Sequence, residues 1–123
     1  MNNKKIVVID DDEILLRVLT AMLQQEGYEV FPYTNSIEAN TQIFEESPPA
    51  LIIIDLSMPL GNGDKKIELL KKHDHTKNIP IILCSGKPEL ELQSIVVKTG
   101  ADGYLIKPFN RTKLNEAIAR VLS

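Results

Sequence analysis

One domain is expected, because 123 residues are enough for a single sizeable hydrophobic core and too few for two. Hydrophobic residues make up 43% and charged residues 25% of the chain, the net charge is −3, and no run of basic residues indicates nucleic-acid binding. The longest apolar runs fall far short of the ~20 residues of a membrane span. We expect a cytoplasmic protein, because Cys84 is the only cysteine and the first residues do not match a signal peptide.

The first predicted strand and helix lie on either side of a run of acids. Residues 6–9 are all apolar, which predicts a buried strand, and Asp10–Glu13 follow at once. Acidic residues suit the N-terminus of a helix, because the free amide groups there carry partial positive charge. Gly27 then marks the end of the helix. Apolar residues at helical spacing lie between these points: Ile14, Leu15, Val18, Leu19, Met22 and Leu23.

A weaker strand and a second helix come next. Residues 28–33 predict a short strand broken by Pro32, which cannot donate a backbone hydrogen bond. Asn35 or Ser36 can cap a helix that runs to about Glu46. We expect three apolar side chains of this helix to face the core: Ile37, Ile43 and Phe44.

The most strongly apolar segment is followed directly by an acid. Residues 51–54 are four consecutive aliphatic residues, as in a central parallel strand that is covered on both faces. Asp55 comes next, and Pro59, Gly61 and Gly63 then end the strand and open a loop. We therefore place Asp55 at the carboxyl end of a buried strand, where open α/β sheets bind their ligands.

The second half of the chain continues the alternation. The pattern predicts a helix over 63–73, a buried strand over 81–84, a helix over 90–98 and a strand over 103–106. Asn110 can cap a final helix, whose apolar stripe consists of Leu114, Ile118, Val121 and Leu122.

Five strands that alternate with five helices predict an α/β fold with a parallel sheet and helices on both faces. The crossover connections should be right-handed. Five such units fit the flavodoxin-like (βα)5 arrangement, in which the strand order is 2-1-3-4-5. In this order the first and third strands are neighbours, so the residues that follow them should lie close together.

Three acids, a hydroxyl and an ammonium should meet at the carboxyl edge of this sheet: Asp10, Asp11, Asp55, Ser85 and Lys107. Two carboxylates about 4 Å apart repel each other by ~4 kcal/mol at an effective dielectric constant near 20, so three of them require a cation. Oxygen ligands favour Mg²⁺ or Mn²⁺ over zinc. Lys107 cannot neutralise three charges and is better suited to bind an anion such as a phosphoryl group.

The chain resembles the receiver domain of two-component response regulators over essentially its whole length. Four separated motifs carry the resemblance: Ile9-Asp10-Asp11; Asp55 with Met58-Pro59 and Gly63; Ser85-Gly86; and Gly103-Tyr104-Leu105-Ile106-Lys107-Pro108-Phe109. The resemblance implies that residues 1–123 form a receiver domain, with no output domain in this sequence. It also implies a cis peptide bond between Lys107 and Pro108.

The resemblance further implies roles for the acids. Asp55 would accept a phosphoryl group from a phosphohistidine on a sensor histidine kinase or a histidine phosphotransfer protein. Asp11, Asp55 and the main-chain carbonyl of Ser57 would bind Mg²⁺ (or Mn²⁺), and Asp10 would act mainly through bound water. Such a domain is a signalling switch that assists its own phosphorylation and dephosphorylation, rather than an enzyme acting on other substrates.

The same resemblance implies a switch that reads the phosphoryl group. Ser85 and Lys107 would contact phosphoryl oxygens, and Tyr104 would turn its ring inward when Ser85 is recruited. The last strand, the last helix and the helix before them would contact an unidentified downstream target, and the chain could form a homodimer. No nucleic acid or membrane partner is expected.

Other interpretations of these residues are open. An adaptor of the same fold could bind partners without phosphorylation. A phosphohydrolase with an aspartyl-phosphate intermediate would need an acid two residues after Asp55, where the chain has Ser57. Tyr104 could be a passive, half-buried core residue. Cys84 is expected to be an inert strand residue.

Overall fold

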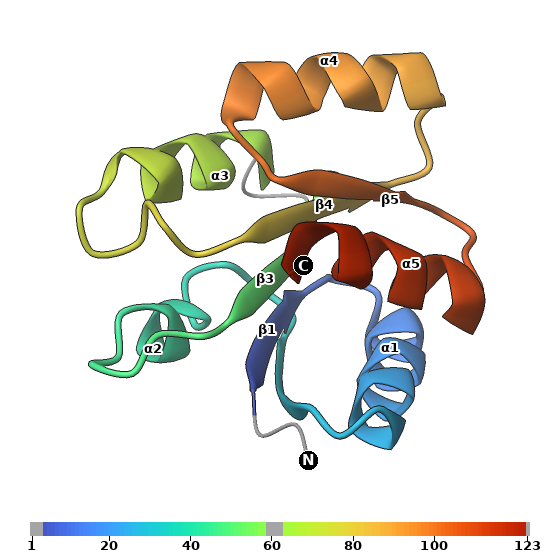
Figure 1. The fold of residues 1–123 in the computed structure, drawn as a ribbon, viewed down its shortest axis with the longest axis horizontal. Coiled ribbons are helices and arrows are strands. Elements are labelled where there is room, and N and C mark those ends of the chain that lie inside the picture. Colours follow the sequence, from blue (N-terminus) through green and yellow to red (C-terminus); the bar gives the residue numbers. More distant parts are fainter. Residues whose placement is uncertain (1–3, 59–62, 123) are drawn as a thin grey trace.

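The computed structural model describes residues 4–58 and 63–122. Its sheet has five parallel strands in the order β2-β1-β3-β4-β5, as predicted (Figure 1). The strands are β1 (Lys5–Ile9), β2 (Glu29–Tyr33), β3 (Leu51–Asp55), β4 (Ile81–Ser85) and β5 (Gly103–Ile106). Every residue of β3 and β4 is buried, because these strands have neighbours on both edges and helices on both faces.

In the described part of the chain, four helices connect the strands and a fifth follows the last strand (Figure 1). They are α1 (Glu13–Gln25), α2 (Asn40–Ile43), α3 (Gly63–Lys72), α4 (Glu89–Thr99) and α5 (Arg111–Leu122). Side chains of α1 and α5 pack on one face of the sheet, and those of α2, α3 and α4 pack on the other. Successive residues of a strand point to opposite faces, so Ile53 belongs to the first of these layers while Ile52 and Ile54 belong to the second.

The start of α1 has the predicted cap, but its buried face is rotated from the predicted one. The Asp12 carboxylate accepts hydrogen bonds from the amides of Ile14 (3.0 Å) and Leu15 (3.1 Å). The buried residues are Leu16, Leu19 and Leu23, whereas Ile14 and Val18 are 76% and 45% exposed. The sequence offers apolar residues on more than one side of this helix, and only contact with the sheet decides which of them are covered.

The predicted helix between Asn35 and Glu46 is much shorter than expected. The Asn35 carboxamide oxygen accepts a hydrogen bond from the Glu38 amide (2.8 Å), which closes a turn, and α2 has only four residues. Ile43 is buried as predicted. The predictions for Ile37 and Phe44 were wrong, because they are 77% and 41% exposed on either side of a helix too short to turn them toward the sheet.

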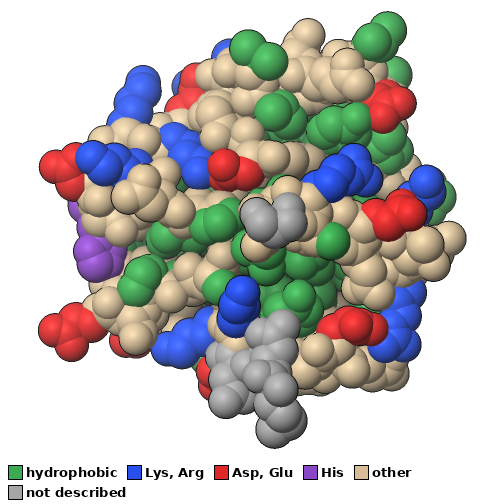
Figure 2. Space-filling view, in the orientation of Figure 1, with side chains coloured by type: hydrophobic (Ala, Val, Ile, Leu, Met, Phe, Trp, Pro, Cys, Tyr) green, Lys and Arg blue, Asp and Glu red, His purple; other side chains and the backbone are tan. Residues whose placement is uncertain are grey.

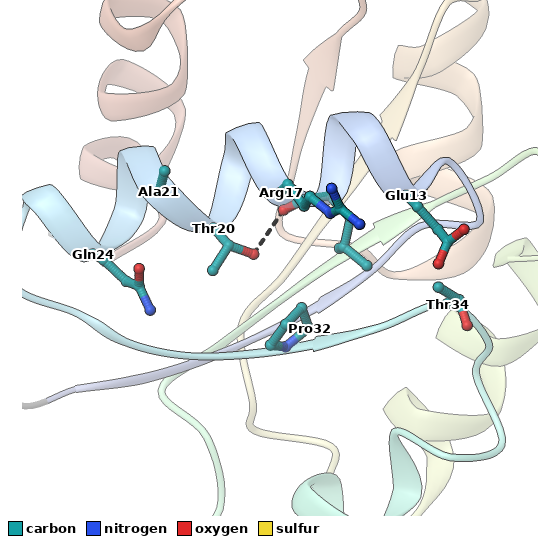
Figure 3. A pocket seen from close by; sticks show the side chains of 8 residues that line it. Glu13, Arg17, Thr20, Ala21, Gln24, Pro32 and Thr34 are labelled. Atoms are coloured by element: carbon teal, nitrogen blue, oxygen red, sulfur yellow. Dashed lines mark hydrogen bonds between the residues drawn. The ribbon is translucent and has the colours of Figure 1, made fainter.

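Strand β2 continues through Pro32, which was predicted to break it. Pro32 pairs with Val8 of β1. Because β2 is an edge strand, no strand on its other side needs a hydrogen bond from the amide that proline lacks. Pro32 also faces Thr20 and Gln24 of α1 across a shallow groove of about 260 Å³ (Figure 3). The Thr20 hydroxyl in this groove donates a hydrogen bond to the carbonyl of Leu16 (2.7 Å).

Acidic and basic side chains are interspersed on the face of the molecule that Figure 2 shows. That distribution agrees with the absence of basic runs in the sequence. Within residues 4–58 and 63–122, no helix has both the length and the apolar character that a membrane crossing needs.

Candidate functional site

The carboxyl edge of the sheet gathers the residues that the sequence singles out. Asp10 follows β1, Asp55 ends β3, Ser85 ends β4 and Lys107 follows β5. Asp10 and Asp55 are each 3% exposed and Ser85 is 1% exposed. Parallel strands deliver these residues to one edge because all of their carboxyl ends point the same way.

The three acids form one cluster. Asp10, Asp11 and Asp55 each offer a carboxylate oxygen, and these oxygens all lie within 4.8 Å of one another. Two of the acids are buried, whereas Asp11 is exposed. Asp10 also accepts a hydrogen bond from the amide of Asp12 (2.9 Å), which fixes one of its oxygens. The predicted convergence of these carboxylates is therefore confirmed.

Lys107 lies between the two buried carboxylates. Its Nζ atom is 3.0 Å from Oδ2 of Asp10 and 3.3 Å from Oδ1 of Asp55. Burial alone would lower the pKa of the Lys107 ammonium, but the hydrogen bond to Asp10 and the charges of both acids outweigh that effect and raise the pKa. Lys107 thus stays charged and compensates part of the negative charge of the cluster.

Asp55 retains an excess of negative charge around it. Burial raises the pKa of its carboxyl, and the nearby charge of Asp10 adds to this, while the Ser57 amide and Lys107 act in the opposite direction. The Ser57 amide donates to Oδ1 of Asp55 at 3.2 Å. The carboxylate is therefore held in place by one backbone donor and one ammonium, in a site where a further cation would be favourable.

Ser85 and Lys87 lie at the fourth strand end. The Ser85 hydroxyl oxygen accepts a hydrogen bond from the Lys87 amide (3.1 Å), and the Lys87 ammonium is 3.4 Å from Glu91. The side chain of Lys87 thus pairs with α4. A contact of the Ser85 hydroxyl with a phosphoryl group stays a prediction.

The first residue of α3 packs directly against the segment after Asp55. A Cβ atom at Gly63 would lie 2.5 Å from the carbonyl oxygen of Asp55 and 2.9 Å from Cα of Leu56. Only glycine fits such an approach of two backbones. Close packing of α3 against the backbone at Asp55 thus explains why position 63 is a glycine.

Tyr104 connects the last strand to α4. Its hydroxyl donates a hydrogen bond to Oε2 of Glu89 (2.6 Å) and lies 3.4 Å from the carboxamide nitrogen of Gln93, while its ring packs partly against the core. Tyr104 stands out in the sequence by its place in the last motif, whereas nothing in the spacing of Glu89 and Gln93 indicates that they meet it. The Lys107–Pro108 peptide bond is cis, as predicted.

Cys84 is buried beside the site but is not part of it. Burial raises the pKa of its thiol to about 12, so the reactive thiolate form is scarce at neutral pH. This agrees with the expectation of an inert strand residue.

Comparison with known proteins agrees with this geometry. A family model described as "Response regulator receiver domain" matches residues 6–119. The chain belongs to this family. It is 31% identical over 120 residues to the chemotaxis protein CheY of Halobacterium salinarum, covering 98% of both chains. The solved structure of the chemotaxis response regulator CheY4 of Vibrio cholerae superposes with a TM-score of 0.89 at 27% identity, covering 98% of this chain and 100% of that one.

Other relatives of this receiver domain are longer. The phosphate regulon regulatory protein PhoB of Klebsiella pneumoniae is 30% identical over 119 residues, which are 97% of this chain and 52% of PhoB. The chain spans about half the length of that transcriptional regulator and nearly the whole length of CheY.

Proposed function

We propose that this receiver domain accepts a phosphoryl group on Asp55 from the phosphohistidine of a sensor histidine kinase or a histidine phosphotransfer protein. The observation that supports this most directly is the position of Asp55. It is a buried carboxylate that ends the central strand, with the Lys107 ammonium 3.3 Å away and with one oxygen each of Asp10 and Asp11 within 4.8 Å of one of its own.

The site fits a hard divalent cation. It offers three carboxylates, one oxygen of each lying within 4.8 Å of the others, and oxygen donors suit Mg²⁺ or Mn²⁺. Asp11, Asp55 and the main-chain carbonyl of Ser57 would hold the ion, and Asp10 would act mainly through bound water. When bound, the ion neutralises negative charge on the carboxylates and on the phosphoryl oxygens.

The protein's own groups have defined tasks in the transfer. A carboxylate oxygen of Asp55 supplies the electron pair that forms the new P–O bond, and the electrons of the breaking P–N bond return to the imidazole nitrogen of the donor. The Ser57 amide orients the attacking carboxylate. Lys107 is placed to exchange its contact with Asp55 for one with a phosphoryl oxygen, so the transfer needs little rearrangement.

The phosphoryl group would then alter the output face. Ser85, at the end of β4, would bind another phosphoryl oxygen and draw Tyr104 toward it. Such a movement would cost Tyr104 its hydrogen bond to Glu89 of α4, so the phosphoryl group and α4 would be coupled. The downstream target would contact the surface of α4, β5 and α5, and homodimerisation through this surface is part of the proposal.

Intact-mass measurement after incubation with acetyl phosphate tests the proposal. In Mg²⁺ we expect the addition of one phosphoryl group, which is absent in EDTA and absent in Asp55→Asn. Full labelling of Asp55→Asn, or labelling that does not depend on the metal, would show that another residue is the acceptor. An unlabelled but folded wild-type chain would favour the phosphorylation-independent adaptor.

A steady turnover assay on small phosphate esters separates the switch from a phosphohydrolase. Sustained release of phosphate from small phosphate esters would require an acid in the position of Ser57. We expect slow loss of the label and no such turnover.

A further inference from the structure

A groove of about 720 Å³ borders on the acid cluster. One wall is the turn that follows β2, from Thr34 to Glu38, and the other is the outer side of α3 with Lys65, Lys66 and Leu69. Asp11 and Met58 complete the lining. We call this hollow the Ile37–Leu69 groove, after the apolar residues on its two walls. Its volume lies within the range of about 300–1,000 Å³ that is usual for ligand sites.

The two walls present apolar side chains to solvent. Ile37 is 77% exposed and Leu69 is 67% exposed, while Met58 between them is buried. Large apolar residues that are exposed singly are common, but two on opposite walls of one groove are the arrangement that receives an apolar surface. A small polar ion would leave both of them uncovered.

A half-buried cation lies in the same groove. The Lys66 ammonium donates a hydrogen bond to the carboxamide oxygen of Asn40, and within residues 4–58 and 63–122 it has no carboxylate partner. Burial lowers the pKa of this ammonium, since it loses solvation without gaining a counter-ion. An ammonium has three donors, so two remain for an anionic group in the groove.

The other charged residues that line the groove do not cancel the attraction of Lys66 for an anionic group. Lys65 adds a second, exposed cation to the α3 wall, and Glu38 lies on the opposite wall. Asp11 belongs to the acid cluster, whose charge Lys107 and the proposed metal ion compensate. The α3 wall is therefore the part of the groove that favours negative charge.

We propose that the Ile37–Leu69 groove docks an amphipathic helix of a partner protein that carries an acidic residue beside its apolar stripe. The apolar stripe would cover Ile37 and Leu69, and the carboxylate would pair with Lys66. A helix that binds in a groove can contact apolar side chains on both walls at once. A second copy of this chain fits less well, because a symmetric contact would bring the lysines of each α3 wall together.

This docking does not depend on phosphorylation of Asp55. It would place a partner next to the phosphorylation site, between the turn after β2 and α3, whereas the proposed output face consists of α4, β5 and α5. It therefore adds a second contact surface to the output face of the proposed function.

A pair of synthetic helices tests the proposal. Each is an alanine-based, fluorescein-labelled peptide of about 18 residues with one stripe of leucines, flanked by glutamates in the first peptide and by lysines in the second. Fluorescence anisotropy with the unphosphorylated chain in Mg²⁺ measures affinity, and amide NMR shifts locate the contact. We expect the acidic peptide to bind at least about tenfold more tightly than the basic one, with shifts at Ile37, Lys66 and Leu69.

Three variants complete the test. Leu69→Ser and Lys66→Gln should each weaken binding of the acidic peptide by about fivefold or more. Val97→Ser, at a residue of α4 that is 84% exposed, is the matched control and should leave binding unchanged. Since Leu69 is itself 67% exposed, its substitution should not unfold the chain, which a thermal melt checks.

Several results would overturn the docking proposal. These are no binding of the acidic peptide up to about 1 mM, equal binding of the basic peptide, or NMR shifts confined to α4, β5 and α5. Self-association that Leu69→Ser abolishes would identify a second copy as the occupant instead. Asp55→Asn should bind the peptide like the wild type, so failure of the phosphorylation proposal would leave this result unaffected.

Discussion

The Lys107 ammonium lies 3.3 Å from Oδ1 of Asp55, so the residue that follows the last strand supplies a counter-ion for the acid that ends the central strand. Lys107 also contacts Asp10 at 3.0 Å, and one cation is thus shared by two buried carboxylates. Because the compensation is incomplete, the pKa of the Asp55 carboxyl stays raised by burial and by the charge of Asp10. With this partial compensation the chain can fold, and the site still favours an additional cation.

Asp55→Asn should stabilise the metal-free chain at neutral pH. The raised pKa means that folded Asp55 binds its proton more tightly than unfolded Asp55, so stability falls as pH rises from about 4 through the folded pKa. The asparagine variant lacks this loss. Urea denaturation in EDTA should therefore show a difference between the two chains that is small near pH 4, grows with pH and then levels off. A variant that is less stable than the wild type at about pH 7 would contradict this.

Mg²⁺ should raise the melting temperature of the wild-type chain. A ligand that binds only the folded state at about ten times its Kd adds about 1.4 kcal/mol of stability. Asp11→Asn removes an exposed carboxylate of the cluster without leaving a buried group unpaired, so this variant should fold normally and respond much less to the ion. Thermal melts with MgCl2 and with NaCl of matched ionic strength measure the effect. An equal response of both chains would place the ion elsewhere.

Gly63→Ala should destabilise the chain by about 1–3 kcal/mol, because the added Cβ overlaps backbone atoms that have to move. It would lie 2.5 Å from the carbonyl oxygen of Asp55. Gly86→Ala is the matched control: apart from its two chain neighbours, no described residue has a heavy atom within 4 Å of a Cβ there, and the change should stay within about 0.5 kcal/mol. Urea denaturation of both variants compares them. Equal stabilities would show that the start of α3 adapts freely.

Tyr104→Ala should separate phosphorylation from its structural response. Tyr104 has no direct contact with the acid cluster among its hydrogen bonds, so the phosphorylation rate with acetyl phosphate should stay within about twofold of the wild-type rate. The change in α4 amide shifts on phosphorylation should be lost, because the ring and its bond to Glu89 connect β5 to α4. Tyr104→Phe, which keeps the ring, should give an intermediate response. An unchanged α4 response in the alanine variant would reduce Tyr104 to a core residue.

The sequence alone determined the sheet and the site. Uninterrupted aliphatic runs predict strands that are buried on both faces, and their alternation with helices predicts a parallel sheet. Such a sheet has only one carboxyl edge. The meeting of Asp10, Asp55 and Lys107 therefore follows from their places at the carboxyl ends of the strands.

Which helix faces are covered, and which side chains meet across elements, depends on how the elements pack together. Ile14 and Ile37 are as apolar as their buried neighbours, and their exposure follows from where α1 and the turn after β2 lie on the sheet. The hydrogen bonds from Tyr104 to Glu89 and from Lys66 to Asn40 join residues whose spacing carries no periodic signal. Periodicity reports on one element at a time, whereas these features depend on how two elements are placed against each other.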